Sequence, residues 1–156
     1  MDEVILNAHA RHVIERDGVD TYPHECCGFL YGFEDDKRVI TLAVPAANTR
    51  EENRERRFEI SAQEYMKAEL FAEENKLVLL GIYHSHPDHP AIPSDYDLKR
   101  ALPWFSYIIV SIKNRKVANL LSWKLNNSGR FEEERVITKE DIFDPEIFLT
   151  TLNSDN

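Results

Sequence analysis

Two histidines and one aspartate stand at a spacing that suits a metal ion. His84 and His86 lie two residues apart at the end of an apolar run, and Asp97 follows shortly after. Alternate side chains of an extended chain point to the same side, so both imidazoles can reach one ion. Two histidines and a carboxylate leave one tetrahedral position open, as in catalytic zinc sites. The pattern therefore predicts a Zn²⁺ site and favours hydrolysis by a metal-activated water.

Ser94 allows two interpretations. Ser94-x-x-Asp97 has the form of a capping box at a helix start, in which the serine hydroxyl accepts a hydrogen bond from the Asp97 N–H. Beside the histidines, the same hydroxyl could donate to a reaction oxyanion. The two roles are compatible, because a cap fixes the first helical turn and so aims the Asp97 carboxylate at the metal.

A hydrolytic metal site also needs a group that takes a proton from the attacking water and returns it to the leaving amine. Glu25 is the best candidate, because it stands where polar residues give way to the apolar run that begins at Cys26. The local pattern alone does not distinguish Glu25 from Glu15 or Glu34, so this assignment stays open at the level of spacing.

Hydrophobic periodicity predicts the elements that position these residues. We expect helices over residues 3–17, 61–75, 94–102 and 145–152, and a loop over residues 48–57. We expect strands over residues 26–33, 38–44, 77–83, 107–112, 117–123 and 130–137. Together they predict an α/β fold with a mixed, largely antiparallel β-sheet flanked by helices, in a single domain that spans residues 1–156.

Composition limits the classes of partner. The chain is 42% hydrophobic and 30% charged, as in soluble globular proteins, and its formal net charge of −9 disfavours nucleic acid as a partner. We find neither a signal-peptide pattern nor an apolar run near the roughly 18 residues of a membrane span, so no membrane partner is expected. The two cysteines, Cys26 and Cys27, are adjacent and cannot join distant segments, which favours the cytoplasm. They could suggest a nucleophile, but their place in a predicted strand favours small buried side chains.

The motif resembles that of the JAMM (MPN-plus) metalloprotease family. That family has a distant glutamate followed by His-Ser/Thr-His, seven residues, a serine, two residues and an aspartate. Here Glu25 precedes Cys-Cys-Gly, His84-Ser85-His86 follows, and residues 87–93 supply the seven before Ser94-x-x-Asp97. Every position of the motif is matched, and the resemblance extends by element order from about residue 4 to residue 123.

The resemblance implies roles for five residues. His84, His86 and Asp97 would bind zinc, Glu25 would act as the general acid/base, and Ser94 would steady the oxyanion. The implied fold is a sheet flanked by helices, of the cytidine-deaminase-like kind. The implied activity is hydrolysis of the peptide or isopeptide bond after the C-terminal Gly-Gly of a ubiquitin-like or sulfur-carrier protein. Compact bacterial members of the family are similar in length to this chain.

Two other functions compete with this hypothesis. A catalytically inactive scaffold of the same fold would bind a partner without cutting it, but such scaffolds typically lose a motif residue, and this chain retains all of them. A zinc deaminase of nucleosides needs a Cys-x-x-Cys element for its metal, and this sequence contains none. A metallopeptidase therefore remains the favoured function.

Overall fold

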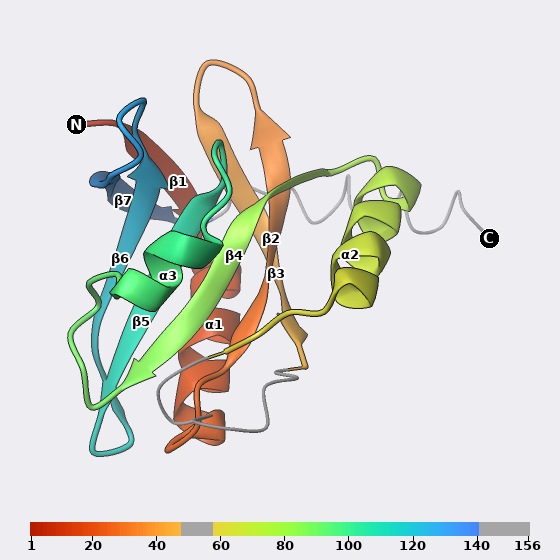
Figure 1. The fold of residues 1–156 in the computed structure, drawn as a ribbon. Helices are drawn as coiled ribbons and strands as arrows, with labels where there is room; N and C mark the ends of the chain where they lie inside the picture. Colours follow the sequence, from red (N-terminus) through yellow and green to blue (C-terminus); the bar gives the residue numbers. More distant parts are fainter. Residues whose placement is uncertain (48–57, 141–156) are drawn as a thin grey trace.

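Strands dominate the protein (Figure 1). The structure is a computed structural model that describes residues 1–47 and 58–140. In these residues the strands are β1 (Glu3–Asn7), β2 (Cys27–Glu34), β3 (Arg38–Ala46), β4 (Val78–Pro87), β5 (Ser106–Lys113), β6 (Lys116–Leu125) and β7 (Phe131–Lys139). The helices are α1 (Ala8–Thr21), α2 (Ala62–Glu74) and α3 (Asp95–Arg100).

The strands form a closed barrel in the order β1-β3-β2-β4-β5-β6-β7. Closure comes from β1, which pairs in parallel with β3 on one side and with β7 on the other; Val4, for example, lies between Arg38 and Val136. The β4–β5 pair is also parallel, and the other pairs are antiparallel. The expectation of a sheet flanked by helices is therefore wrong, because the sheet curls until its first and last strands meet.

The error arises at the N-terminus, where the sequence pattern predicted one helix over residues 3–17. Residues Val4–Leu6 form a strand instead, because pairing with two neighbours satisfies their backbone groups and buries their side chains. The helix α1 starts only after Asn7, whose side chain accepts hydrogen bonds from the N–H groups of His9 (2.8 Å) and Ala10 (3.3 Å). The strand missed by the prediction is the one that closes the barrel.

The remaining described elements lie where the sequence predicted them. The main difference is that β4 continues to Pro87, so both histidines of the motif lie inside a strand rather than after one. The predicted loop over residues 48–57 and the predicted helix over residues 145–152 fall outside the described residues. Within residues 1–47 and 58–140, no helix has the length and apolar character needed to cross a membrane.

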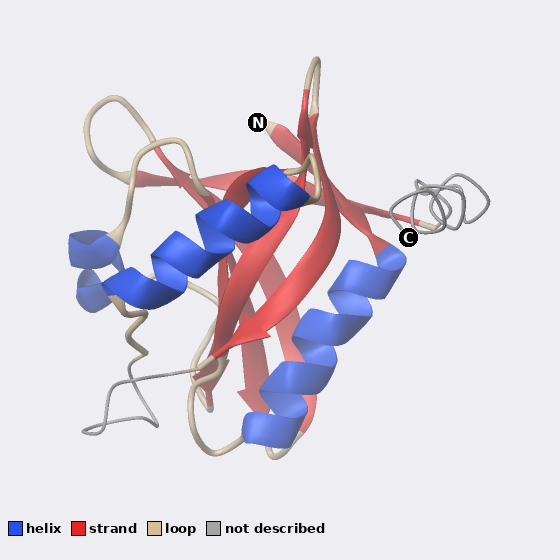
Figure 2. Ribbon diagram, turned by 90° about the vertical axis from the view of Figure 1, so that its right-hand side faces the viewer, coloured by secondary structure: helices blue, strands red, loops and turns tan. Residues whose placement is uncertain are grey.

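Two hydrophobic cores lie on the two faces of the strands. The strands β1 to β6, together with α1, contribute buried side chains to the inner core, which includes Leu6, Ile14, Leu30, Ile40, Leu80, Ile108 and Leu120, and the half-buried Val136 of β7 packs against it. The outer core lies between α2 and the outer face of β2, β4 and β5, and includes Phe29, Tyr31, Ala68, Ala72, Ile82 and Tyr107. Figure 2 shows α1 and α2 on different sides of the strands. Strands buried on both faces form a rigid support for the C-terminal end of β4.

A β-bulge decides which face carries the histidines. Opposite β2, the register shifts so that Leu80 is an extra residue in β4. Beyond the bulge, Ile82 faces the outer core and Tyr83 the inner core. Gly81 lies beside β5 so closely that an added Cβ would meet the Ser106 carbonyl oxygen at 1.9 Å. Because side chains alternate, His84 and His86 point to the outer face, where α2 and α3 lie.

Candidate metal centre

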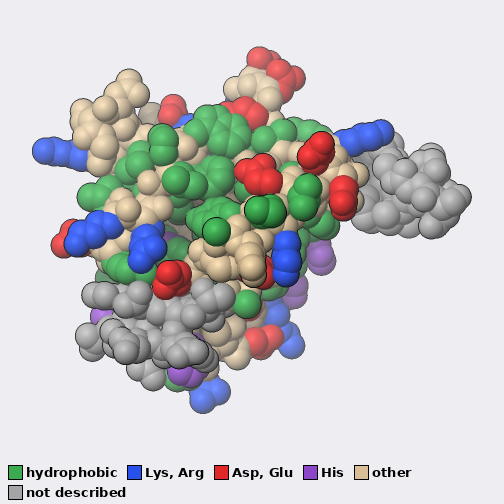
Figure 3. Space-filling model, turned by 45° about the vertical axis from the view of Figure 1, so that its right-hand side comes forward, with side chains coloured by type: hydrophobic (Ala, Val, Ile, Leu, Met, Phe, Trp, Pro, Cys, Tyr) green, Lys and Arg blue, Asp and Glu red, His purple; other side chains and the backbone are tan. Residues whose placement is uncertain are grey.

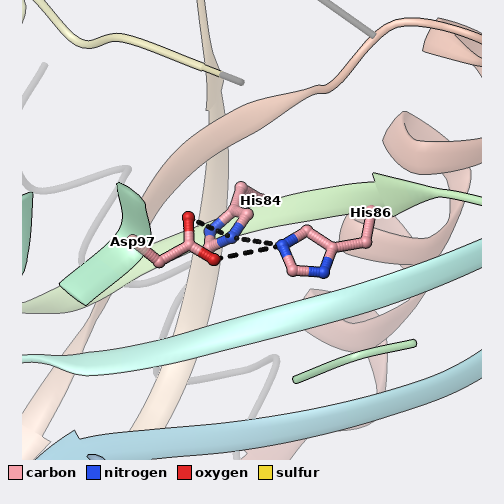
Figure 4. Close-up of side chains that lie close together, drawn as sticks. All are labelled: His84, His86 and Asp97. Atoms are coloured by element: carbon pink, nitrogen blue, oxygen red, sulfur yellow. Dashed lines mark hydrogen bonds and ion pairs between the residues drawn. The ribbon is translucent and has the colours of Figure 1, made fainter. Parts of the chain in front are cut away.

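The two histidines and the aspartate of the motif converge on one point (Figure 4). The Nε2 atom of His84 lies 3.2 Å from that of His86, and the Asp97 carboxylate oxygens lie 3.3 Å from His84 Nε2 and 3.1 Å from His86 Nε2. All three side chains are buried. Four tetrahedral ligands at the usual zinc distances are separated by about 3.3 Å, so these spacings match the edges of a zinc coordination sphere. We call these three residues, which could hold one metal ion, the metal centre.

Hydrogen bonding shows why a cation fits there. The Nδ1 atom of His86 lies 2.8 Å from the Pro90 carbonyl oxygen. A carbonyl only accepts hydrogen bonds, so in the neutral ring Nδ1 carries the proton and Nε2 carries a lone pair. That lone pair faces the Asp97 carboxylate and the His84 ring. Such a buried, electron-rich arrangement repels itself unless a proton or a metal ion lies between the atoms.

The charge states favour metal binding at neutral pH. Burial lowers the pKa of His84 below its ordinary value, in spite of the opposing influence of Asp97, so the ring is neutral. Burial alone would raise the pKa of Asp97, but the neighbouring His84 ring and the hydrogen bond from the Ser94 N–H hold that pKa well below its ordinary value. A neutral imidazole and an ionised carboxylate are the forms that bind metal.

The Nδ1 atoms of the two histidines, which face away from the metal centre, differ in their hydrogen bonding. His86 donates from Nδ1 to Pro90, as a metal ligand should. The Nδ1 atom of His84 is buried and has no hydrogen-bond partner among the described residues. The His84 ring instead stacks on Phe58, with 4.4 Å between ring centroids. Within the described part of the chain, stacking on Phe58 and the contact of Nε2 with the Asp97 carboxylate orient this imidazole.

The cap predicted at Ser94 is present. Ser94 Oγ accepts a hydrogen bond from the Asp97 N–H (3.1 Å), and the Ser94 N–H donates to Asp97 Oδ2 (2.8 Å). The second bond holds the same carboxylate oxygen that faces His86. Ser94 itself is exposed. The capping box therefore aims Asp97 at the two histidines, as its sequence pattern suggested.

Glu25 is buried and stands two residues before Cys27, at the start of β2. Cys27 is paired with His84, and the Ser85 N–H donates to the Cys26 carbonyl (3.1 Å), so the register continues beyond the start of β2. Continued by one more residue, this register would bring Glu25 opposite His86. Directly opposite residues have Cβ atoms about 5 Å apart and share a face. Glu25 is 2% exposed, which sets it apart from an ordinary surface glutamate.

The cysteines are not suited to nucleophilic chemistry. Both thiols are free and buried. Burial raises the pKa of the Cys26 thiol well above its ordinary value and raises that of Cys27 to about 12. The thiolate is the nucleophilic form, so both groups are inert at neutral pH. This confirms the expectation of small buried side chains.

A cavity of about 330 Å³ opens beside the metal centre. His84 and Asp97 are part of its lining, and most of the remaining wall is apolar or aromatic, formed by Phe58, Ile60, Tyr65, Ile82, Leu102 and Tyr107. Glu59 and Arg100 supply charge at its wall. Hydrophobic side chains also gather on the surface over the face that carries α2 (Figure 3). The metal centre is thus reached from a mainly apolar hollow.

Sequence analysis missed three features of this site. Phe58 stacks on His84, the Pro90 carbonyl fixes the His86 tautomer, and Ser85 bonds to the Cys26 backbone. The first two carry no signal in the sequence, because any apolar ring or backbone carbonyl could serve. Ser85 did carry a signal, since a polar residue at the end of a wholly buried strand requires hydrogen-bond partners.

Comparison with known proteins assigns the family. Residues 6–126 match the family described as prokaryotic homologs of the JAB domain, and the chain belongs to this family. Members of the JAB family are typically metal-dependent, in accord with the metal centre. This membership confirms the resemblance drawn from the motif.

Curated relatives and solved structures agree with the assignment. A desampylase from Pyrococcus furiosus is 31% identical over 74% of this chain and 76% of its own length. A desampylase from Haloferax volcanii is 35% identical over 62% of this chain and 69% of its own length. A solution structure from Desulfitobacterium hafniense has a TM-score of 0.77 and 29% identity, covering 88% of this chain and 94% of that chain. One from Salinibacter ruber has a TM-score of 0.66 and 36% identity, covering 93% of this chain and 95% of that chain.

Proposed function

We propose that this protein is a zinc-dependent metallopeptidase or isopeptidase. It hydrolyses the peptide or isopeptide bond after the C-terminal Gly-Gly of a ubiquitin-like or sulfur-carrier protein. The observation that carries the proposal is the metal centre, in which four nitrogen and oxygen atoms of three buried side chains lie 3.1–3.3 Å from their neighbours beside a cavity. The family assignment and the two relatives named desampylase support the reaction class.

Each residue of the site has a distinct role in this proposal. His84, His86 and Asp97 hold the zinc, which when bound supplies an acidified water and polarises the scissile carbonyl. Glu25 accepts the proton of the attacking water and returns it to the departing amine. Ser94 donates its exposed hydroxyl to the oxyanion that forms on the carbonyl. The cavity holds the extended tail of the carrier, and its apolar wall excludes water from the scissile bond.

Cleavage of a defined substrate tests the proposal. The substrate is a ubiquitin-like protein extended beyond its C-terminal Gly-Gly by a short peptide, with the same protein joined to a lysine side chain as a second substrate. We expect mass spectrometry to show cleavage directly after Gly-Gly in at least one of them. Glu25→Gln should keep the zinc but reduce kcat by about 100-fold or more, because it removes only the proton carrier.

Glu15→Gln is the matched control, since Glu15 lies on α1 and pairs with Arg11 at 2.8 Å. It should cleave like the wild type. If the zinc-loaded wild type binds the carrier but cuts neither substrate, the proposed function is wrong and the protein acts as a scaffold. If Glu25→Gln cleaves at the wild-type rate, the role assigned to Glu25 is wrong.

A further inference from the structure

Ser85, the residue between the two histidines, has no part in the proposed chemistry, yet it is fully buried. Side chains alternate along β4, so Ser85 points away from the metal centre, toward the inner face. Its hydroxyl oxygen accepts a hydrogen bond from the Cys26 N–H at 2.8 Å. Its own N–H donates to the Cys26 carbonyl at 3.1 Å. Both backbone groups of Cys26 are therefore bonded to this one residue.

The first of these bonds differs from a regular strand ladder. In an antiparallel pair, the Cys26 N–H would donate to a backbone carbonyl, which every residue type provides. Here it donates to a side chain, so the bond exists only because residue 85 carries a hydroxyl. Cys26 is 4% exposed, and water cannot readily replace a lost partner for its N–H.

This bond controls the peptide unit that carries Glu25. The Cys26 N–H belongs to the planar peptide group between Glu25 and Cys26. Fixing the direction of that N–H restrains the orientation of the plane and the position of the Glu25 Cα, from which the side chain leaves the backbone. His84 and His86 lie on either side of Ser85 in β4. The hydrogen bonds of Ser85 therefore link the backbone next to Glu25 to the strand that carries two of the metal ligands.

We propose that Ser85 is a positioning residue that aligns the Glu25 carboxylate with the metal centre through the Cys26 peptide. This inference rests on the proposed role of Glu25. Ser85 does not touch substrate or metal; it acts on the direction of the glutamate alone. The alignment of a catalytic group matters strongly, because a displacement near 1 Å can cost about 100-fold in rate.

The test combines kinetics with a backbone measurement. In Ser85→Ala we expect zinc content and KM to match the wild type, while kcat falls by about 10- to 100-fold. Ser85→Thr, which keeps the hydroxyl, should recover most of the lost rate. Ser85→Ala combined with Glu25→Gln should be no slower than Glu25→Gln alone, because both changes remove the same contribution. Amide hydrogen exchange at Cys26, followed by NMR in zinc-free protein, should be slow in the wild type and fast in Ser85→Ala.

Ser122→Ala is the matched control, because Ser122 is also fully buried and its hydroxyl donates to Glu134 Oε1 (2.9 Å) in another part of the barrel. It should keep the wild-type kcat. An unchanged kcat in Ser85→Ala, a loss of zinc from it, or fast Cys26 exchange in the wild type would each overturn the inference. If Ser85→Ala does not fold, the kcat of Ser85→Thr and the rate of Cys26 amide exchange in the wild type test the inference instead. If the wild type cuts nothing while Cys26 exchange still depends on Ser85, the proposed function is wrong, but the hydrogen bond from the Cys26 N–H to the Ser85 hydroxyl is confirmed.

Discussion

At the scale of single residues, the metal centre depends on keeping His84 uncharged. The ring is 1% exposed and stacks on Phe58, and this burial opposes its protonation. Asp97 beside it stays ionised because the neighbouring His84 ring and the hydrogen bond from the Ser94 N–H outweigh the effect of burial and keep the pKa of the carboxyl low. The neutral His84 ring and the ionised Asp97 carboxylate can therefore bind a divalent cation without first losing the proton of a charged imidazole.

This charge state predicts how the stability of the zinc-free protein depends on pH. The pKa of His84 is lowered in the folded protein, so between that value and the ordinary value of 6.5 the unfolded chain binds more protons. The free energy of unfolding should consequently fall as the pH decreases below 6.5, by at most about 1.4 kcal/mol per pH unit from this group. Urea unfolding with chelator at pH 7 and pH 5.5 measures the effect. His84→Gln should show a smaller decrease than the wild type; equal decreases in the two proteins would contradict a neutral His84 in the folded state.

The residue types of the metal centre were predictable from the sequence, and their contacts were not. The spacing of His84, His86 and Asp97 indicated convergence, and the structure brings all three together. No pattern pointed to the Pro90 carbonyl or to stacking by Phe58, because these contacts depend on how loops fold back on the strand. Glu25 could not be separated from other glutamates until its burial and its place just before the Cys27–His84 pair were visible.

At the scale of elements, the short helix α3 exists largely because of its cap. It has only six residues, too few to be stable by hydrogen bonds along the helix alone. The capping box of Ser94 and Asp97 satisfies two N–H groups at its start and orients the carboxylate. Removing the Ser94 hydroxyl should therefore affect both the helix and the metal centre.

Two cap substitutions separate these effects. Ser61 caps α2 in the same way, accepting a hydrogen bond from the Glu64 N–H at 3.1 Å. We expect Ser94→Ala and Ser61→Ala each to lower the free energy of unfolding by about 1 kcal/mol. Only Ser94→Ala should also weaken zinc binding, measured by competition with a chromogenic chelator. Equal zinc affinity in the two variants would show that the cap does not position Asp97.

At the scale of the whole molecule, closure of the barrel could not be predicted from the sequence. Strand and helix patterns are local, whereas closure requires β1 to meet β7 across the length of the chain. The order of most elements and the position of the motif were predicted correctly. The N-terminal strand was mistaken for part of a helix, because Val4–Leu6 is too short a run to reveal its period.

Hydrogen exchange tests the closure directly. In a parallel ladder, consecutive residues direct their N–H groups alternately to the two neighbouring strands. The amides of Val4, Ile5 and Leu6 should therefore all exchange slowly, because β1 has β3 on one side and β7 on the other. In an open sheet with β1 at its edge, every second amide would exchange rapidly. An alternation of fast and slow amides along β1 would contradict the closed barrel.

The most direct test of the whole account is the zinc content of the purified protein, measured by elemental analysis alongside cleavage of the Gly-Gly-extended carrier. The account predicts about one zinc per chain in the wild type and in Glu25→Gln. It predicts much less in His86→Ala and Asp97→Ala, with cleavage lost on chelation and restored by added zinc. A wild-type protein that contains no metal, takes up none, and cleaves its substrate equally well in the presence of chelator would contradict it.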